Sequence, residues 1–315
     1  MSFFNNYRIE RLTPNHYKDL NYISKSAFGF CPGIDYYKRK NETENFGATN
    51  LGFIAYHIDT EEPAAFYGVY SYPVVHNDKK VLADQSGDTM KHKNHTGKGL
   101  FIELAKRTYK LAKDHGAKFV FGFPNQNSYP GFVKKLNWIH DGHLQLFQFK
   151  VFTFPLLKAA KKYKFFRPFY NAWFSFIRQF YKVDLDKNLS IFEGGESFCV
   201  SHNIDFIKYK SFCGSIVIKI NGSKTWIKAD GFLYIGDIER NAAVKLKNYL
   251  SKLKQFAFLI GADKIIFGAS KNSFWYSKFT EIVSPNDGIY LGYYIFEGEL
   301  PMKNFSYVYA DLDTF

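Results

Sequence analysis

The sequence predicts an α/β fold of the α+β type, in which two domains each contain a mixed, mostly antiparallel sheet flanked by helices. Segments with strand-like and helix-like hydrophobic periods alternate through the first half of the chain, and the same order returns in the second half. The two halves also share a literal repeat, because HGAKFVFGFPNQNSY at 115–129 is similar to IGADKIIFGASKNSFW at 260–275. A repeat at a separation of about 145 residues is typical of a duplicated domain.

The first half of the predicted fold opens with a strand and a helix. The strand at 7–12 precedes a helix over 14–29, whose start is marked by Thr13 and Pro14. A hydroxyl group caps a first turn, and proline fits there without losing a hydrogen bond. Three runs rich in β-branched and aromatic residues then predict strands at 51–58, 64–75 and 80–92.

A long helix and a buried strand follow. Apolar residues recur with helical spacing from Leu100, and the run ends at Gly116, which predicts a helix of about four turns. The segment KFVFGF at 118–123 is almost entirely apolar, a pattern typical of a strand buried on both faces. A short helix at 128–138 and an alternating strand at 142–152 complete this half.

The second half repeats this order after a segment of different composition. Residues 153–189 hold cations and large aromatic residues with no acid before Asp184, and we interpret them as a helical connector interrupted at Pro168. The predicted domains are therefore 1–152 and 190–315, joined by this connector. The second domain is predicted to contain strands at 214–220, 226–238, 264–270 and 288–297 and helices at 241–262 and 273–283.

Composition excludes several classes of protein. Aromatic residues make up 20% and apolar residues 46% of the chain, which is too hydrophobic for a disordered protein. No window of about 18 apolar residues predicts a membrane span, and the N-terminus lacks the pattern of a secretion signal. We therefore expect a cytoplasmic protein. Cys31, Cys199 and Cys213 lack metal-ligand spacing and are expected to be reduced thiols of the core.

The net charge of +13 favours an anionic partner. A phosphorylated cofactor, a small or lipid-linked anionic acceptor and a membrane surface all fit, whereas no recognised nucleic-acid module is present and nucleic acid is not the expected partner. The connector holds seven cations and ten aromatic residues between 155 and 182. Two interpretations stay open for it: peripheral contact with the inner face of the membrane, or packing of its aromatic side chains against both domains while its lysines face water.

The stretch HKNHTGKGLF at 92–101 places two glycines around a lysine, immediately before the long helix. The first turn of a helix has backbone N–H groups without intrahelical acceptors and lies at the positive end of the helix dipole. Glycine at positions 97 and 99 removes the Cβ atoms that would hold a phosphate group away from those N–H groups, and it allows positive φ angles. Lys98 and the nearby histidines add positive charge. The stretch is therefore predicted to bind a pyrophosphate.

Other motifs fit this stretch less well. A Walker loop needs serine or threonine after Gly-Lys, where Gly99 stands, and a Rossmann fingerprint needs a third glycine at Ile102. Both motifs are set aside. No spacing that predicts a metal site is found among His16, His57, His76, His115, His140, His143 and His202.

The sequence from Asn94 to Gly99 resembles the acyl-CoA loop of the GNAT acyltransferase superfamily. That loop reads Gln or Arg, two residues, Gly, one residue, and Gly or Ala, so Gly97 and Gly99 match and Asn94 departs from the pattern. The order of predicted elements over the whole first domain also resembles the family. The resemblance implies two GNAT-like domains and an acyltransferase that uses acetyl-CoA or another acyl-CoA.

This resemblance implies where coenzyme A would bind. The pyrophosphate would contact the N–H groups of residues 96–100, and the pantetheine arm would pair with the backbone at 90–92 and pass between the ends of two strands. An asparagine commonly lies near that arm in the family. The expected cofactor-binding residues are Met90, Lys91, His92, Thr96, Gly97, Lys98, Gly99, Leu100 and Asn125.

Two carboxylates precede the acyl-CoA loop on the strand where GNAT enzymes often carry their base. Acyl transfer to an amine needs a group that takes a proton from the nucleophile. In a regular strand Asp84, Ser86 and Asp88 share one face, and two carboxylates on one face raise the pKa of one of them. A bulge at Gly87 would break this register. Asp88 is the preferred base, and a solvated strand end is the alternative for Asp84.

The acid that protonates the leaving thiolate is usually a tyrosine of the short helix in this family. Phe132 stands nearest that place in this chain, which departs from the pattern. Tyr129 lies almost one turn earlier and is the candidate acid. Packing of Tyr129 in the cleft or the core is the alternative.

The corresponding junction of the second half, YIGDIERNAAVKL, has no Gly-x-Gly. Asp237 and Glu239 stand there instead, and their charge opposes the binding of phosphate groups. We therefore expect one acyl-CoA per chain, with a degenerate second GNAT-like domain that shapes the acceptor cleft.

The predicted function is transfer of an acetyl or similar acyl group to an amine. An amino sugar on a nucleotide- or lipid-linked precursor of a surface polysaccharide fits the positive charge of the chain. One alternative is a relative of the peptidoglycan-branching aminoacyl transferases, which also pair two GNAT-like domains but typically lack the glycine pair. The other is a module that binds coenzyme A or lipid without turnover, which Phe132 favours.

Overall fold

The chain divides into two compact units, each assembled from separate stretches of sequence. The computed structural model describes residues 6–77, 79–97, 99–183, 198–298, 300, 302 and 305–315. The first unit comprises Met1–Val74, Lys79–Gly142 and Tyr290–Pro301. The second unit comprises Val75–Asp78, His143–Ile289 and Met302–Phe315.

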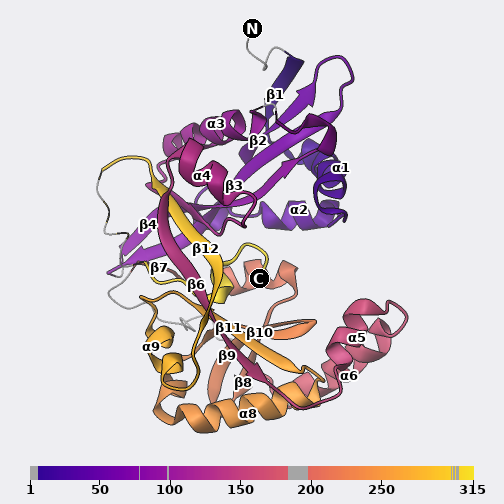
Figure 1. Cartoon of the computed structure of the whole chain (residues 1–315), viewed down its shortest axis with the longest axis vertical. Coiled ribbons are helices and arrows are strands. Elements are labelled where there is room, and N and C mark those ends of the chain that lie inside the picture. Colours follow the sequence, from indigo (N-terminus) through magenta and orange to yellow (C-terminus); the bar gives the residue numbers. More distant parts are fainter. Residues whose placement is uncertain are drawn as a thin grey trace. The chain divides into compact units, whose positions relative to one another are not determined.

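A mixed sheet forms the centre of the first unit, with strand order β1-β2-β3-β4-β5-β12 (Figure 1). The strands span Tyr7–Arg11 (β1), Leu51–His57 (β2), Pro63–His76 (β3), Lys79–Lys91 (β4), Phe119–Gly122 (β5) and Asn286–Ile295 (β12). β1, β2 and β3 are antiparallel, β4 and β5 pair in parallel, and β5 pairs antiparallel with β12. All residues of β5 are buried, as its apolar sequence predicts.

Helices cover both faces of this sheet (Figure 1). They span Tyr17–Phe28 (α1), Ile34–Lys40 (α2), Leu100–Asp114 (α3) and Tyr129–Leu136 (α4). α1 and α2 pack on one face, in a cluster that contains Phe66 and Met90. α3 and α4 pack on the other face, in a cluster that contains Tyr67, Leu104 and Phe132.

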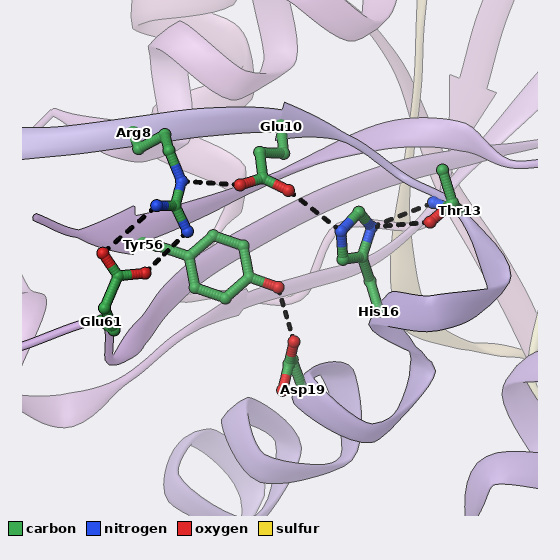
Figure 2. A network of polar contacts seen from close by, with 7 residues as sticks. All are labelled: Arg8, Glu10, Thr13, His16, Asp19, Tyr56 and Glu61. Carbon is green, nitrogen blue, oxygen red and sulfur yellow. Dashed lines mark hydrogen bonds and ion pairs between the residues drawn. The ribbon is translucent and has the colours of Figure 1, made fainter.

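A polar network holds the first strand and helix at the edge of this sheet (Figure 2). Arg8 of β1 binds Glu61 through both Nη atoms, at 3.2 and 2.7 Å, and its Nε lies 2.6 Å from Glu10. Tyr56 of β2 donates a hydrogen bond to Asp19 of α1. Because exposed ion pairs contribute little to stability, this network mainly fixes the direction in which the chain enters α1.

Strands in the order β6-β11-β10-β9-β8 form the centre of the second unit. They span Ile139–Lys150 (β6), Ile216–Ile220 (β8), Ser223–Asp230 (β9), Phe232–Ile238 (β10) and Lys264–Ala269 (β11). A short β7 at Cys199–Val200 lies off this path and pairs with β3. β10 and β11 are parallel, and the other neighbours are antiparallel. The helices are Leu156–Lys162 (α5), Arg167–Gln179 (α6), Ile204–Lys210 (α7), Leu246–Leu259 (α8) and Phe274–Thr280 (α9).

The two units share one arrangement and exchange their last strands. In each, a parallel strand pair is joined through a long helix: β4-α3-β5 in the first unit and β10-α8-β11 in the second. β12, from the end of the sequence, pairs with β5, and residues 145–150 of β6 pair with β11. The linear ranges 1–152 and 190–315 did not anticipate this exchange, and as domain boundaries they stay a prediction.

The predicted fold class and the predicted strands and helices of both halves are confirmed, with local differences. α2 was not predicted, and the segment 226–238 contains parts of two strands separated by Gly231. The connector forms α5 and α6, and its break lies before Pro168, which stands in the first turn of α6. Residues 184–189 of the connector lie outside the described residues.

Two further expectations concern the cysteines and the membrane. Cys31 is exposed and Cys199 and Cys213 are partly exposed, so the expectation that all three are core thiols is wrong. Within the described ranges, no helix combines the length and the apolar character that crossing a bilayer would require.

Candidate active site

The β4–α3 loop has the backbone that its two glycines predicted. β4 ends at Lys91, and α3 begins at Leu100. Gly97 and Gly99 both adopt left-handed backbone angles, with φ of +77° and +74°. Side chains with a Cβ atom are strained in this conformation, so glycine is required at both positions. Lys98, between them, lies outside the described residues.

The N-terminus of α3 leaves backbone N–H groups without acceptors among the described residues. The Gly99 carbonyl accepts hydrogen bonds from Ile102 and Glu103 and closes the first turn. In the part of the chain that the structure describes, the N–H groups of Gly97, Gly99 and Leu100 have no acceptor. A Cβ atom at Gly97 would meet nothing within 4 Å, so the space beside the loop is open. The loop therefore fits an anion such as a phosphate group at the positive end of the helix dipole.

β4 and β5 pair only over part of β4. The parallel register joins residues 83–86 with residues 119–122. β5 then ends at Gly122, whereas β4 continues to Lys91 and into the loop. The far end of β4 therefore extends beyond the pairing with β5, on the side where the sequence placed the pantetheine arm.

The backbone of His92 is already occupied. Its N–H donates to the Ala64 carbonyl of β3 at 2.8 Å, and its carbonyl accepts from His95. Because alternate residues of a strand direct their backbone groups to opposite edges, Met90 shares the β3 side with His92. Of the three residues predicted to pair with the pantetheine arm, only Lys91 directs its backbone groups toward the β5 side.

A cluster of polar side chains holds His95, in the part of the β4–α3 loop that follows β4. His95 Nε2 lies 2.9 Å from Glu62, and its Nδ1 lies 2.9 Å from the Tyr7 hydroxyl. Tyr22 donates to Glu62 at 2.7 Å, and these hydrogen bonds from Tyr22 and His95 lower the pKa of Glu62. Possible ligand atoms of Glu62, His92 and His95 lie within 4.8 Å of one another, a metal-like set that the sequence analysis did not predict. Sequence spacing missed this set because Glu62 is 33 residues from His95.

Asp84 is buried between strands rather than solvated. Its Oδ1 accepts a hydrogen bond from Ser71 at 2.7 Å, and its Oδ2 has no partner among the described residues. Burial raises the pKa of Asp84 to about 7, although the hydrogen bond from Ser71 opposes the shift. The sequence analysis attributed a raised pKa to repulsion between Asp84 and Asp88, whereas burial is what raises the pKa of Asp84.

Asp88 lies on the opposite face of the sheet from Asp84. It accepts a hydrogen bond from Tyr70 at 2.5 Å and pairs with Lys40 of α2 at 2.9 Å, whereas Asp84 contacts Ser71. Adjacent residues of β3 point to opposite faces, so Tyr70 and Ser71 separate the two carboxylates. The prediction that Asp84 and Asp88 share a wall is wrong, because Asp88 has a φ of +49° and turns the strand at this point.

The Asp88 carboxylate keeps one oxygen available. Tyr70 and Lys40 both bind Oδ2, and Oδ1 has no hydrogen bond within the described ranges. Its side chain is 14% exposed, whereas the Asp84 residue is 1% exposed. Of the two predicted candidates, only Asp88 has an oxygen that a substrate could approach.

In the turn before α4, the side chain of Asn125 binds backbone N–H groups of the turn itself. The Asn125 Oδ1 accepts hydrogen bonds from the N–H groups of Asn127 and Ser128 at 2.9 and 3.0 Å. Only its Nδ2 group therefore remains to donate a hydrogen bond to a bound cofactor. The prediction that Asn125 binds the cofactor remains open in this narrower form.

Tyr129 begins α4 and stands partly exposed. Its ring stacks on Tyr290 at 4.1 Å between centroids and meets His140 edge-on at 5.4 Å. Its hydroxyl group has no hydrogen bond with any residue that the structure describes. Phe132, where the family commonly has tyrosine, is buried in the cluster around Tyr67.

One further carboxylate was missed by the sequence analysis. Asp141 of β6 is partly buried, and this burial raises its pKa to about 6. Asp141 also contributes to the raised pKa of Tyr293 on β12, after the effect of burial. Nothing in the local sequence marks Asp141, because an alternating strand gives no information on which polar residue becomes enclosed.

The corresponding junction of the second unit is closed by its own side chains. Asp237, at the end of β10, accepts from His202 at 2.7 Å, and Asp311 binds the other ring nitrogen at 2.8 Å. Burial alone would lower the pKa of His202, but the hydrogen bonds and charges of the two aspartates raise it to about 9. The Glu239 side chain accepts from the backbone N–H of Lys224. These carboxylates bind groups of the unit itself, and the expectation of one acyl-CoA per chain stays a prediction.

Comparisons with known proteins agree with this geometry. The family model of the acetyltransferase (GNAT) domain matches residues 8–140. No curated protein sequence matches the chain.

Several solved structures share the fold over nearly the whole chain. A Pyrococcus horikoshii protein assigned as an acetyltransferase is 13% identical, with a TM-score of 0.52, over 98% of this chain and 95% of that one. The GCN5-related N-acetyltransferase from Kribbella flavida is 11% identical, with a TM-score of 0.55, over 92% and 72%. The N-myristoyltransferase of Saccharomyces cerevisiae, solved with bound myristoyl-CoA, is 10% identical, with a TM-score of 0.51, over 92% and 82%.

These structural matches show the fold, and the family model matches residues 8–140. That segment contains the β4–α3 loop, its two left-handed glycines and the free N–H groups of α3. Residues 8–140 therefore form a domain that is similar to the acetyltransferase (GNAT) domain.

Proposed function

We propose that this protein transfers an acetyl or similar acyl group from coenzyme A to an amine. The observation that carries the proposal is the β4–α3 loop, where Gly97 and Gly99 are left-handed and the N–H groups at the start of α3 are free. The coenzyme A pyrophosphate would bind these N–H groups. The pantetheine arm would follow β4 beyond its pairing with β5, with Lys91 as its backbone partner and Asn125 Nδ2 as a donor.

The proposed reaction uses two side chains of the first unit. The neutral amine attacks the thioester carbonyl, so that an N–C bond forms and the C–S bond breaks. Asp88 Oδ1 takes the proton that the amine loses. Tyr129, whose hydroxyl group is not engaged by the described residues, returns a proton to the leaving thiolate.

An amino sugar on a nucleotide- or lipid-linked precursor of a surface polysaccharide is the acceptor that we propose. Its support is the charge of +13, which favours a phosphorylated acceptor. The acyl group is proposed to be acetyl. Because a protein of similar fold was solved with myristoyl-CoA, longer thioesters belong in the same test.

Binding is tested first, by the thermal stability of the full chain with acetyl-CoA. Saturating ligand raises stability by mass action, by about 2.7 kcal/mol at a hundredfold excess over the dissociation constant. Gly97→Glu should abolish the rise, because it adds a side chain and a negative charge at the loop. Gly29→Glu is the matched control, since Gly29 in the same unit also has a left-handed φ of +78° and open space around it. An unchanged rise in the Gly97 variant contradicts the proposed site.

Turnover is tested next, with amino sugars and acyl-CoA thioesters of increasing length. Free thiol released only in the presence of an amine supports acyl transfer. Binding without turnover on any amine would instead support a module that holds coenzyme A.

A further inference from the structure

Helix α6, at Arg167–Gln179, and the residues next to its two ends carry a stripe of exposed aromatic side chains. Phe165, Phe169, Trp173, Phe176 and Phe180 are exposed by between 41% for Trp173 and 76% for Phe165. Their spacing of four, four, three and four residues places them along one side of the helix. We call these five residues the aromatic stripe. Contiguous exposed apolar surface of this kind marks an interaction site.

The opposite side of α6 is firmly attached to the second unit. Tyr170 and Ile177 are buried. The Tyr170 hydroxyl donates to the Ile260 carbonyl at 3.0 Å. Trp173 lies at the border of the aromatic stripe, because its Nε1 donates to the Leu259 carbonyl at 2.9 Å while 41% of the residue stays exposed. The helix therefore already buries one face, and the aromatic stripe is additional apolar surface that its own unit does not cover.

Cations without acidic partners accompany the aromatic stripe. Lys158 and Lys161 of α5 pair with Asp263 and Asp230. The other cations of this segment have no ion pair with any described acid: Lys162, Lys164, Arg167, Arg178 and Lys182. The segment 151–183 contains no Asp or Glu at all.

The lysines of α5 also line a cavity of about 260 Å³ together with Asp230, Phe232 and Tyr234. Lys158 and Lys161 in its wall are paired with Asp263 and Asp230, so Lys162 supplies the positive charge of the lining that has no acidic partner among the described residues. Such a cavity suits an anionic headgroup better than a neutral one.

We propose that the aromatic stripe and the cations of α5 and α6 dock this protein on an anionic lipid bilayer. Phenylalanine and tryptophan side chains enter the boundary between headgroups and acyl chains, while lysine and arginine attract anionic headgroups. A second copy of the chain fits less well. It would bring the same unpaired cations together, and segment 151–183 offers no carboxylate to meet them.

Flotation of the full chain with vesicles tests the proposal. We expect binding to vesicles of phosphatidylcholine with phosphatidylglycerol at least about tenfold stronger than to phosphatidylcholine alone, and loss of this difference at high salt. Equal binding to both vesicles, or none to either, overturns the proposal.

Trp173 provides a direct readout. The other three tryptophans, Trp138, Trp226 and Trp275, are buried. Vesicles with brominated acyl chains should therefore quench only Trp173, and the Trp173→Phe variant should show no quenching while it still binds. Quenching that persists in this variant contradicts insertion of the aromatic stripe.

Two matched double variants distinguish binding through the aromatic stripe from nonspecific adsorption through any exposed phenylalanine. Phe169→Ser with Phe176→Ser should reduce binding to anionic vesicles by at least about tenfold, since each phenylalanine removed takes away a large buried apolar area. Phe28→Ser with Phe30→Ser is the control, because these two phenylalanines of the first unit are similarly exposed. An equal loss of vesicle binding in the two double variants overturns the proposal. The proposal is also overturned if the wild type is a dimer, the Phe169/Phe176 variant is a monomer and both bind vesicles equally.

Discussion

The junctions β4–α3 and β10–α8 each connect the first strand of a parallel pair to a long helix, but their polar groups have different partners. At the first, two left-handed glycines and free N–H groups leave a place for an anion. At the second, Glu239 accepts from a backbone N–H, and Asp237 joins the buried set with His202 and Asp311. The first junction leaves its polar groups to a ligand, whereas the second satisfies them internally.

This difference shows how a duplicated unit can specialise without changing its fold. Hydrogen-bonding groups left open for a ligand are not stabilised by the protein itself. The second junction fills the corresponding place with carboxylates and a histidine. The first junction therefore keeps polar groups open to an anion, whereas the second uses them within the unit.

The largest expected effect is a loss of kcat on substitution of Asp88 near the first junction, compared with little change on substitution of Glu239 at the second. Asp88→Asn should lower kcat by about 10² to 10⁴, the range for loss of a general base, with the KM for acyl-CoA little changed. Glu239→Gln and Asp84→Asn are the controls and should leave kcat within a few-fold of the wild type. Steady-state kinetics with acetyl-CoA and an amine check this. Full activity in Asp88→Asn would assign the base elsewhere, with Asp141 as the next residue to test.

Substitution at the second junction should affect stability instead of binding. Asp237→Ala leaves His202 with one of its two carboxylate partners and should cost about 3 to 5 kcal/mol of unfolding free energy. Its acetyl-CoA affinity, measured by calorimetry below the melting temperature, should match the wild type. A large loss of affinity would show that the second junction takes part in cofactor binding.

The same buried set predicts how stability depends on pH. The pKa of His202 is raised in the folded state to about 9, from about 6.5 in the unfolded chain, so protonated His202 favours the folded state. This contribution is complete below pH 6.5 and is lost as the pH rises through about 9. The wild type should lose on the order of 3 kcal/mol across this window. Denaturant unfolding of His202→Gln, which cannot titrate, should be flatter over the same range, and an equal slope in both proteins would contradict the assignment.

The smallest expected effect concerns the loop backbone. Gly97→Ala should cost about 1 to 2 kcal/mol, because a Cβ atom strains the left-handed conformation. Gly29→Ala should cost about the same, since it has the same backbone angles and equally open space. Only the Gly97 variant should also bind acetyl-CoA more weakly. Equal affinities would mean that the loop conformation is not what the cofactor recognises.

The sequence predicted the features that depend on local patterns. Gly97 and Gly99 revealed the loop, and helical spacing from Leu100 revealed α3, because backbone requirements and hydrophobic periods are local properties. The direction of Asp88 was not predictable, since the turn in β4 rests on a positive φ at an aspartate. The grouping of Glu62 with His95 depends on which strands become neighbours, and single-sequence periods do not contain that information.

The exchange of β6 and β12 sets the order in which this protein can be completed during synthesis. β5 obtains its β12 neighbour only from residues 292–295, near the end of the chain. The first sheet therefore has an open edge until residues 292–295 have been synthesised, and an open edge invites pairing with other chains. A fragment that stops at residue 152 would keep this edge permanently, together with a β6 strand that lacks β11. Separate expression of the two halves would thus yield two aggregation-prone proteins rather than two folded, functional domains.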